Sequence, residues 1–140
     1  MLRAVLDANV YVSAAIRPEG PPGQLVERFL RTSAFAIILS PAIVEETLKA
    51  LAYPKVKKYL RAEVDASAWF EAIVVLADLV PGEYAIDGVS EDPDDNKYVA
   101  AAVEGRATFV VTGDPDLLEV EQHLGIRIVR PREFLDLLRR

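Results

Sequence analysis

Short apolar runs alternate along this chain with longer segments in which apolar residues recur every three or four positions. A short continuous apolar run bounded by turn residues indicates a buried strand, and the three-to-four spacing indicates an amphipathic helix. The runs predict strands around Val5 and Leu6 and at residues 35–39, 109–111 and 126–129, with a further short strand at residues 84–86.

The helical spacing predicts helices between these strands, and their ends carry recognisable signals. Ser40 is a helix N-cap residue followed by a proline, and Gly105 is typical of a helix end. Asp94 is expected to cap the helix that follows the acidic segment. Residues 17–23, rich in proline and glycine, are expected to form a loop. The predicted helices are 10–16, 24–31, 41 to about 53, 55–61, 65–80, 95–104, 115–124 and 131–138.

Strands that alternate with helices in this way predict an α/β fold with a central parallel, doubly wound sheet. The 140 residues are enough for one domain with a substantial core, and the 51% hydrophobic content excludes a disordered or fibrous chain. The sequence contains no repeat, low-complexity segment or linker. We therefore expect residues 1–140 to form a single domain.

The composition narrows the chemistry that the chain can carry out. It has no cysteine and a single histidine, His123, which excludes thiolate and histidine-rich zinc sites. A bound metal would need oxygen ligands, which favours Mg²⁺ or Mn²⁺. No apolar run approaches the roughly 20 residues that span a bilayer, and the N-terminus lacks the features of a signal peptide. We expect a cytoplasmic protein without a membrane segment.

The net charge of −6 argues against passive binding of nucleic acid by a basic surface. It does not exclude a nuclease, because clustered acids carry metal ions as their countercharge. It also makes a basic protein partner plausible.

Acidic residues recur where the predicted strands end or helices begin. Asp7 follows the first apolar run, and Asp114 follows the run at 109–111 in a similar arrangement. In open α/β sheets, ligands bind beyond the carboxyl ends of the strands. Two more acidic places lie between them: Glu45 or Glu46, and Asp94 or Asp95 within an acidic loop that begins at Glu91.

Carboxylates that converge in a partly buried site repel one another and lose hydration, and a hard divalent cation removes that cost. Magnesium takes few carboxylates and completes its shell with water and substrate phosphate oxygens. The chemistry that such a site favours is phosphodiester hydrolysis, with one metal ion or two.

Each acid also has a purely structural interpretation. Aspartates at strand ends are common cap and turn residues, which applies to Asp94 and to Asp114 before its proline. Asp116 would complement a helix dipole, and Glu45 and Glu46 would lie on the solvated face of a helix. The joint pattern, rather than any one acid, favours a metal site.

Four motifs in this order resemble the PIN-domain ribonucleases, and most of all their prokaryotic toxin branch, which is similar to VapC. The resemblance covers nearly the whole chain. The motifs are Val-Leu-Asp-Ala-Asn-Val at 5–10, Ser-Pro-Ala-Ile-Val-Glu-Glu-Thr-Leu at 40–48, Asp-Pro-Asp-Asp-Asn-Lys-Tyr at 92–98 and Val-Thr-Gly-Asp-Pro-Asp-Leu-Leu at 111–118.

The resemblance implies a three-layer α/β/α fold and an acidic quartet that binds Mg²⁺ or Mn²⁺ and cleaves RNA. Carried over, the catalytic and metal-binding acids are Asp7, Glu46, Asp95 and Asp114, with Asp94, Asp116 and Glu45 as alternates. Asn9 and Thr112 match supporting polar positions. The family also implies a small antitoxin protein as partner, and many of its members are homodimers.

A basic cluster lies outside these motifs. Lys55, Lys57, Lys58 and Arg61 could hold RNA phosphates beside the site, or could simply form a solvated helix face. The alternative to a ribonuclease is a catalytically inactive module of the same fold that binds RNA or protein.

Overall fold

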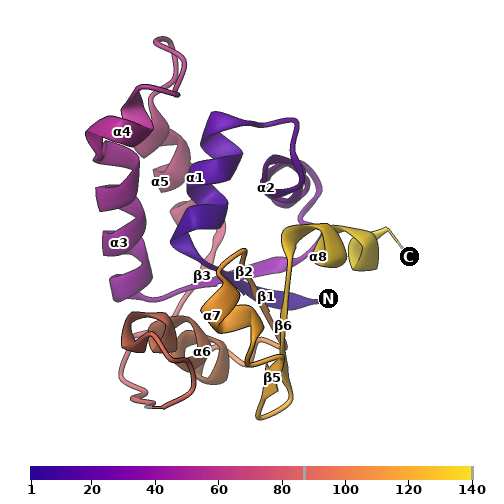
Figure 1. The fold of residues 1–140 in the computed structure, drawn as a ribbon. Helices are drawn as coiled ribbons and strands as arrows, with labels where there is room; N and C mark the ends of the chain where they lie inside the picture. Colours follow the sequence, from indigo (N-terminus) through magenta and orange to yellow (C-terminus); the bar gives the residue numbers. More distant parts are fainter. Residues whose placement is uncertain (87, 140) are drawn as a thin grey trace.

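The computed structural model describes residues 1–86 and 88–139, and its centre is a six-stranded sheet in the order β3-β2-β1-β4-β6-β5 (Figure 1). All neighbouring strands are parallel except β5, which runs antiparallel to β6. The strands are β1 Arg3–Leu6, β2 Ala36–Leu39, β3 Asp78–Leu79, β4 Phe109–Val111, β5 Gln122–His123 and β6 Ile126–Val129.

Helices cover both faces of the sheet and give three α/β/α layers, as the sequence predicted. Helices α1, α2 and α8 lie on one side, and α6 lies on the other (Figure 1). The helices are α1 Ala8–Ile16, α2 Pro21–Thr32, α3 Pro41–Ala52, α4 Pro54–Lys57, α5 Ala66–Leu76, the 3₁₀ turn η1 Pro93–Asp95, α6 Asn96–Glu104, α7 Pro115–Leu118 and α8 Pro131–Leu138. No helix in the described ranges is both long and apolar enough to cross a bilayer.

The direction of strand addition reverses between β1 and β4. From β1 the chain proceeds to β2 and β3 on one side, and from β4 it proceeds to β6 on the other. The connections therefore diverge at the carboxyl ends of β1 and β4, which is the place where α/β folds bind their ligands. We refer to the region beyond the carboxyl ends of these two strands as the crevice. Residues that follow Leu6 and Val111, which are paired in register, lie at this crevice.

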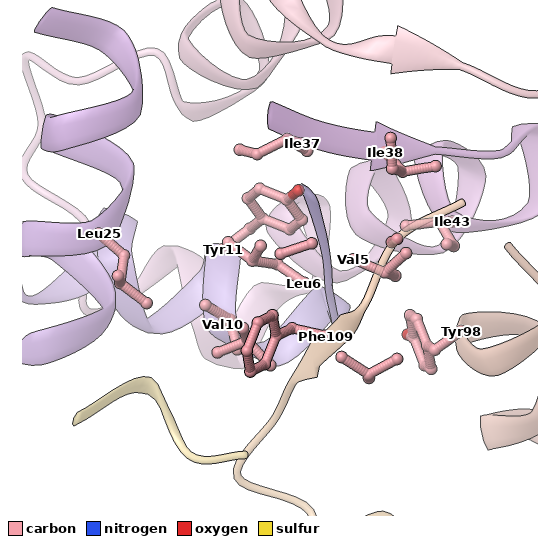
Figure 2. Close-up of a cluster of buried hydrophobic side chains, with 14 of the residues drawn as sticks. Val5, Leu6, Val10, Tyr11, Leu25, Ile37, Ile38, Ile43, Tyr98 and Phe109 are labelled. Atoms are coloured by element: carbon pink, nitrogen blue, oxygen red, sulfur yellow. The ribbon is translucent and has the colours of Figure 1, made fainter. Parts of the chain in front are cut away.

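The core that holds these strands is apolar and rich in aromatic side chains. Val5, Leu6 and Ile37 have no solvent exposure, and Tyr11 packs edge-on against Phe70 with ring centroids 5.0 Å apart. Figure 2 shows Tyr11 and Leu6 beside β1, with Tyr98 on the α6 side of the same strand. The β1 strand is thus buried on both faces, which fixes the residues at its end.

Several predicted element boundaries were wrong, and local chemistry explains each. Helix α2 begins at Pro21, inside the predicted loop, because prolines are tolerated in the first turn of a helix. The helix predicted for 65–80 ends at Leu76, and the Val80 amide instead donates to the Leu39 carbonyl at 2.9 Å, so β3 joins the sheet edge. Residues 84–86, which are all described, form no strand.

The remaining differences lie in short helices. Helix α4 covers 54–57 rather than 55–61. The helix predicted for 115–124 stops at Leu118, because Gln122 and His123 pair with β6. Asp92, not Asp94, caps the turn before α6, since its side chain accepts from the Asp94 amide.

Candidate active site

Asp7 lies at the carboxyl end of β1, where its side chain also caps α1. Only 3% of the residue is exposed. One carboxylate oxygen accepts from the Asn9 amide at 2.5 Å, and the other accepts from the Thr112 hydroxyl. Burial raises the pKa of Asp7, and the hydrogen bonds from Thr112 and Asn9 oppose that rise. The carboxylate is therefore held in one orientation at the crevice.

Thr112 links Asp7 to Asp114. Leu6 pairs with Val111 in the sheet, so the residues that follow them, Asp7 and Thr112, are neighbours. The Thr112 hydroxyl donates to Asp7 and accepts from the Asp114 amide at 3.0 Å. Asp114 in turn caps α7, with its carboxylate accepting from the Asp116 amide at 3.0 Å. One hydroxyl thus couples the first and the last acidic motif.

Asp95 approaches this pair from the end of η1, just before α6. It is 7% exposed, and the Ser90 hydroxyl donates to its carboxylate at 3.4 Å. Burial raises the pKa of Asp95 to about 7, and the contact with Asp114 and the charges of Asp114, Asp92 and Asp7 add to the rise. Asp95 and Asp114 therefore come close enough to compete for one proton.

Glu46 reaches the crevice from the middle of α3. Its carboxylate accepts from the Lys97 ammonium and from the Tyr98 hydroxyl. The same Tyr98 oxygen accepts from the Ala8 amide at 3.3 Å. Burial and the Glu46 contact raise the pKa of Tyr98, so its hydroxyl remains a donor. Glu45 instead points to solvent, where it pairs with Lys49 at 3.1 Å.

The donor set at this crevice fits a hard divalent cation. Carboxylate oxygens of Asp92, Asp95 and Asp116 lie within 4.8 Å of one another. Within the described ranges, no lysine or arginine forms an ion pair with Asp7, Asp95 or Asp114. The ligands that these side chains offer are oxygens, and uncompensated carboxylates of this kind suit magnesium or manganese.

The structure brings most of the predicted residues together. Asp7, Thr112, Asp95 and Asp114 meet at the crevice, and Glu46 joins them through Tyr98. Asn9 contributes its backbone amide, while its side chain is exposed. Asp94 is exposed and takes no part, whereas the alternate Asp116 joins the acidic group. The basic cluster lies apart from this crevice, on and just after α4: Lys55, Lys57, Lys58 and Arg61.

Sequence reasoning missed the residues that support the acids. Tyr98 and Asn96 belong to the third motif, yet neither was given a role; the Asn96 side chain accepts from the Ser90 amide at 3.0 Å. Ser90 lies two positions before Asp92, outside every motif. The available signal was the helical spacing that places Tyr98 on a buried face of α6 close to Asp95.

Residues 3–116 match the sequence profile of the PIN domain. The chain belongs to the PIN domain family. PIN domains are generally nucleases. The chain is 27% identical over 143 residues to the uncharacterized protein MJ1680 of Methanocaldococcus jannaschii. The aligned region covers 96% of this chain and 90% of that protein.

Among solved structures, this PIN domain is similar to VapBC2 from Rickettsia felis bound to a DNA fragment from the promoter. The TM-score is 0.55 at 13% identity, over 92% of this chain and 98% of the other. At this identity the likeness establishes the shared fold, and it agrees with the observed three-layer architecture.

Proposed function

We propose that this PIN domain is a metal-dependent endoribonuclease. The observation that carries the proposal is the convergence of Asp7, Asp95 and Asp114 from separate parts of the chain, with no lysine or arginine of residues 1–86 and 88–139 paired to any of them. Such an arrangement costs folding energy in the metal-free protein, because like charges in a partly buried site repel. A site that serves only to stabilise the fold would not be expected to accumulate that cost.

In this proposal Asp7, Asp95, Asp114 and Glu46 hold Mg²⁺ or Mn²⁺, with Asp92 and Asp116 at the rim. The bound cation would supply Lewis-acid polarisation of the scissile phosphodiester. Thr112 keeps the Asp7 carboxylate turned toward the crevice, and Tyr98 and Lys97 do the same for Glu46. These contacts mean that the carboxylates need little rearrangement before substrate binds, which favours catalysis.

We further propose that the chain is the toxin of a toxin–antitoxin pair and acts in the cytoplasm on RNA. Support comes from its PIN membership and from its likeness in fold to the toxin–antitoxin assembly VapBC2. The net charge of −6 would favour a small antitoxin whose contact surface is basic.

The test is cleavage of a mixed single-stranded RNA pool by purified protein, with Mg²⁺ or Mn²⁺ and then with EDTA. We expect cleavage that requires metal and that falls by at least about a hundredfold in Asp7→Asn and Asp114→Asn, because each change removes a charged ligand. A matched single-stranded DNA pool tests the preference for RNA.

The two neighbouring glutamates of α3 provide an internal control. Glu46→Gln should lose activity, whereas Glu45→Gln, which alters only an exposed residue paired with Lys49, should retain it. Full metal-dependent cleavage by Asp7→Asn would refute the mechanism. Absence of both cleavage and metal binding in the wild-type protein would favour the inactive binding module.

A further inference from the structure

The segment that follows α3 carries an unusual concentration of exposed cationic and aromatic side chains. Lys55, Lys57, Lys58 and Arg61 fall within seven residues that contain no acid, in a chain whose net charge is −6. Tyr53 and Tyr59 flank and interrupt this run and are 55% and 69% exposed. We call residues 53–61 the basic arm.

The cations of the basic arm are unpaired within the part of the chain that the structure describes. None of the four forms an ion pair with any residue in the ranges 1–86 and 88–139. All four side chains are exposed. Unpaired cations crowded on one turn repel one another, and an anionic ligand would relieve that repulsion.

The two tyrosines point to the kind of anion. Exposed aromatic rings are unfavourable in water, and covering them with a ligand is favourable. They are also the groups on which unpaired nucleic-acid bases stack. A groove that binds single strands combines such rings with cations that follow the phosphates. Duplex RNA keeps its bases stacked inside the helix and offers no face to Tyr59.

A hollow next to the basic arm adds room for a base. It has a volume of about 440 Å³ and lies between α4 and the start of α5. The hollow is lined by the cations Lys57 and Arg61, by the apolar side chains of Leu51, Leu60 and Val64, and by the acids Glu63 and Asp65. A base would lie against the apolar side chains with its phosphate turned to the two cations and away from the acids.

The basic arm is also placed to act together with the acidic crevice. Glu46 and Tyr53 are connected by the second half of α3, and α4 lies at the end of α3 away from α6 and α7 (Figure 1). Seven helical residues span about 10 Å, which corresponds to about three phosphate spacings of a stacked strand. A strand held at the basic arm could therefore reach the crevice.

We infer that the basic arm binds an unpaired stretch of the RNA substrate a few nucleotides from the point of cleavage. This inference rests on the proposed ribonuclease function and adds to it the residues, outside the acidic crevice, that hold the unpaired strand. The cations contact phosphates, and Tyr59 stacks on a base.

The test measures binding of a fluorescently labelled, unstructured 12-nucleotide RNA by anisotropy, in the Asp7→Asn background so that the RNA stays intact. Lys57→Glu and Lys58→Glu should each weaken binding by about fivefold or more. Each should also make the slope of log affinity against log salt less negative by about 0.7. Arg132→Glu, an exposed residue of α8, makes the same charge change and should have little effect.

Tyr59 distinguishes stacking from charge. Tyr59→Ala should weaken binding at least about fivefold, whereas Tyr59→Phe, which keeps the ring, should bind like the parent. A duplex of the same sequence should bind more weakly and be insensitive to Tyr59→Ala. Thermal melting of each variant at the parent temperature confirms that the fold is intact.

Three outcomes would overturn the inference: equal loss in Arg132→Glu, unchanged binding in the arm variants, or equal loss in Tyr59→Phe and Tyr59→Ala. The second outcome would leave the cations free to serve an acidic protein partner. Because binding and cleavage are measured separately, unchanged RNA binding beside metal-dependent cleavage rejects the basic arm alone. Arm-dependent binding without cleavage rejects the nuclease and keeps the basic arm.

Discussion

The contrast between Asp94 and Asp95 shows how much a single residue's surroundings determine. The two are adjacent in sequence, yet Asp94 is exposed and Asp95 is buried against Ser90, close to Asp114. Asp95 shares a helical face with Val99 and Ala102, both of which have no solvent exposure. The elevated pKa of Asp95 follows from this burial and from three neighbouring carboxylates, and it has a measurable consequence for stability.

We expect the metal-free protein to lose stability as the pH rises from about 4 to about 7. Folded Asp95 keeps its proton up to a pKa of about 7, whereas the unfolded chain releases it near 4, so protonation favours the fold in this window. Each unit of raised pKa corresponds to about 1.4 kcal/mol. Thermal melts in EDTA between pH 5 and pH 8 measure the decline.

The matched variants for this experiment are Asp95→Asn and Asp94→Asn. The first should reduce the dependence of melting temperature on pH, leaving the part that Asp7 contributes, and the second should preserve it. If both variants decline like the wild-type protein, burial of Asp95 does not determine the effect.

At this scale the sequence located the acids better than their supports. Asp7 and Asp114 could be placed at one edge of the sheet from the sequence, because both follow apolar runs that were expected to be parallel strands, and Thr112 came from the resemblance to the PIN family. Tyr98 could not, because its role depends on how α6 crosses β1 and on the distance to Glu46. Such a contact is a property of helix packing, and no local pattern encodes it.

Among the elements, α2 is set by a close approach that only glycine allows. A Cβ atom on Gly23 would lie 2.2 Å from the backbone oxygen of Pro18, well inside contact distance. Pro18 lies in the turn between α1 and α2, and Gly23 lies in the first turn of α2. The missing side chain is therefore what lets the helix begin as early as Pro21.

Gly23→Ala should destabilise the protein by about 1–3 kcal/mol, the usual cost of overpacking. The added Cβ would clash with backbone atoms of Pro18, which cannot move aside as a flexible side chain could. Chemical denaturation with urea measures the free energy of unfolding. Gly113→Ala is the control, since its added Cβ meets nothing within 4 Å and its φ is not positive. Equal stability of the two variants would show that the turn relaxes without cost.

The elements themselves were predicted unevenly. Strands β1, β2, β4 and β6 and helices α3, α6 and α8 were recognised because each has a long enough pattern or a clear cap. Strands β3 and β5 were missed because they have two residues each and pair only through backbone hydrogen bonds with β2 and β6. Pairing at a sheet edge depends on the neighbour rather than on the strand's own residues.

For the whole molecule, the β3 edge of the sheet stands out because its large apolar side chains face solvent. Val75 and Leu76 at the end of α5 are 82% and 59% exposed, and Leu79 of β3 is 62% exposed. β3 is also an edge strand whose outer backbone groups lack a ladder partner. Apolar surface beside an open edge is typical of an interface.

We expect the chain to form a homodimer through this edge. Sedimentation equilibrium should give twice the 15.4 kDa of one chain. Val75→Glu should shift the equilibrium to monomer, because it places a charge in the centre of the patch. Leu124→Glu, an exposed apolar residue beyond the opposite edge at β5, should leave the dimer intact. A monomeric wild-type protein would contradict the prediction.

The backbone hydrogen bond between Asp7 and Val111 determines how late in synthesis the acidic site can form. The amide of Asp7 donates to a carbonyl that the ribosome adds about a hundred residues later, and Asp114 follows later still. A nascent chain that has exposed its first acidic motif therefore has no assembled crevice. If the chain is a nuclease, it stays harmless to the RNA around it until β4 has emerged and joined the sheet.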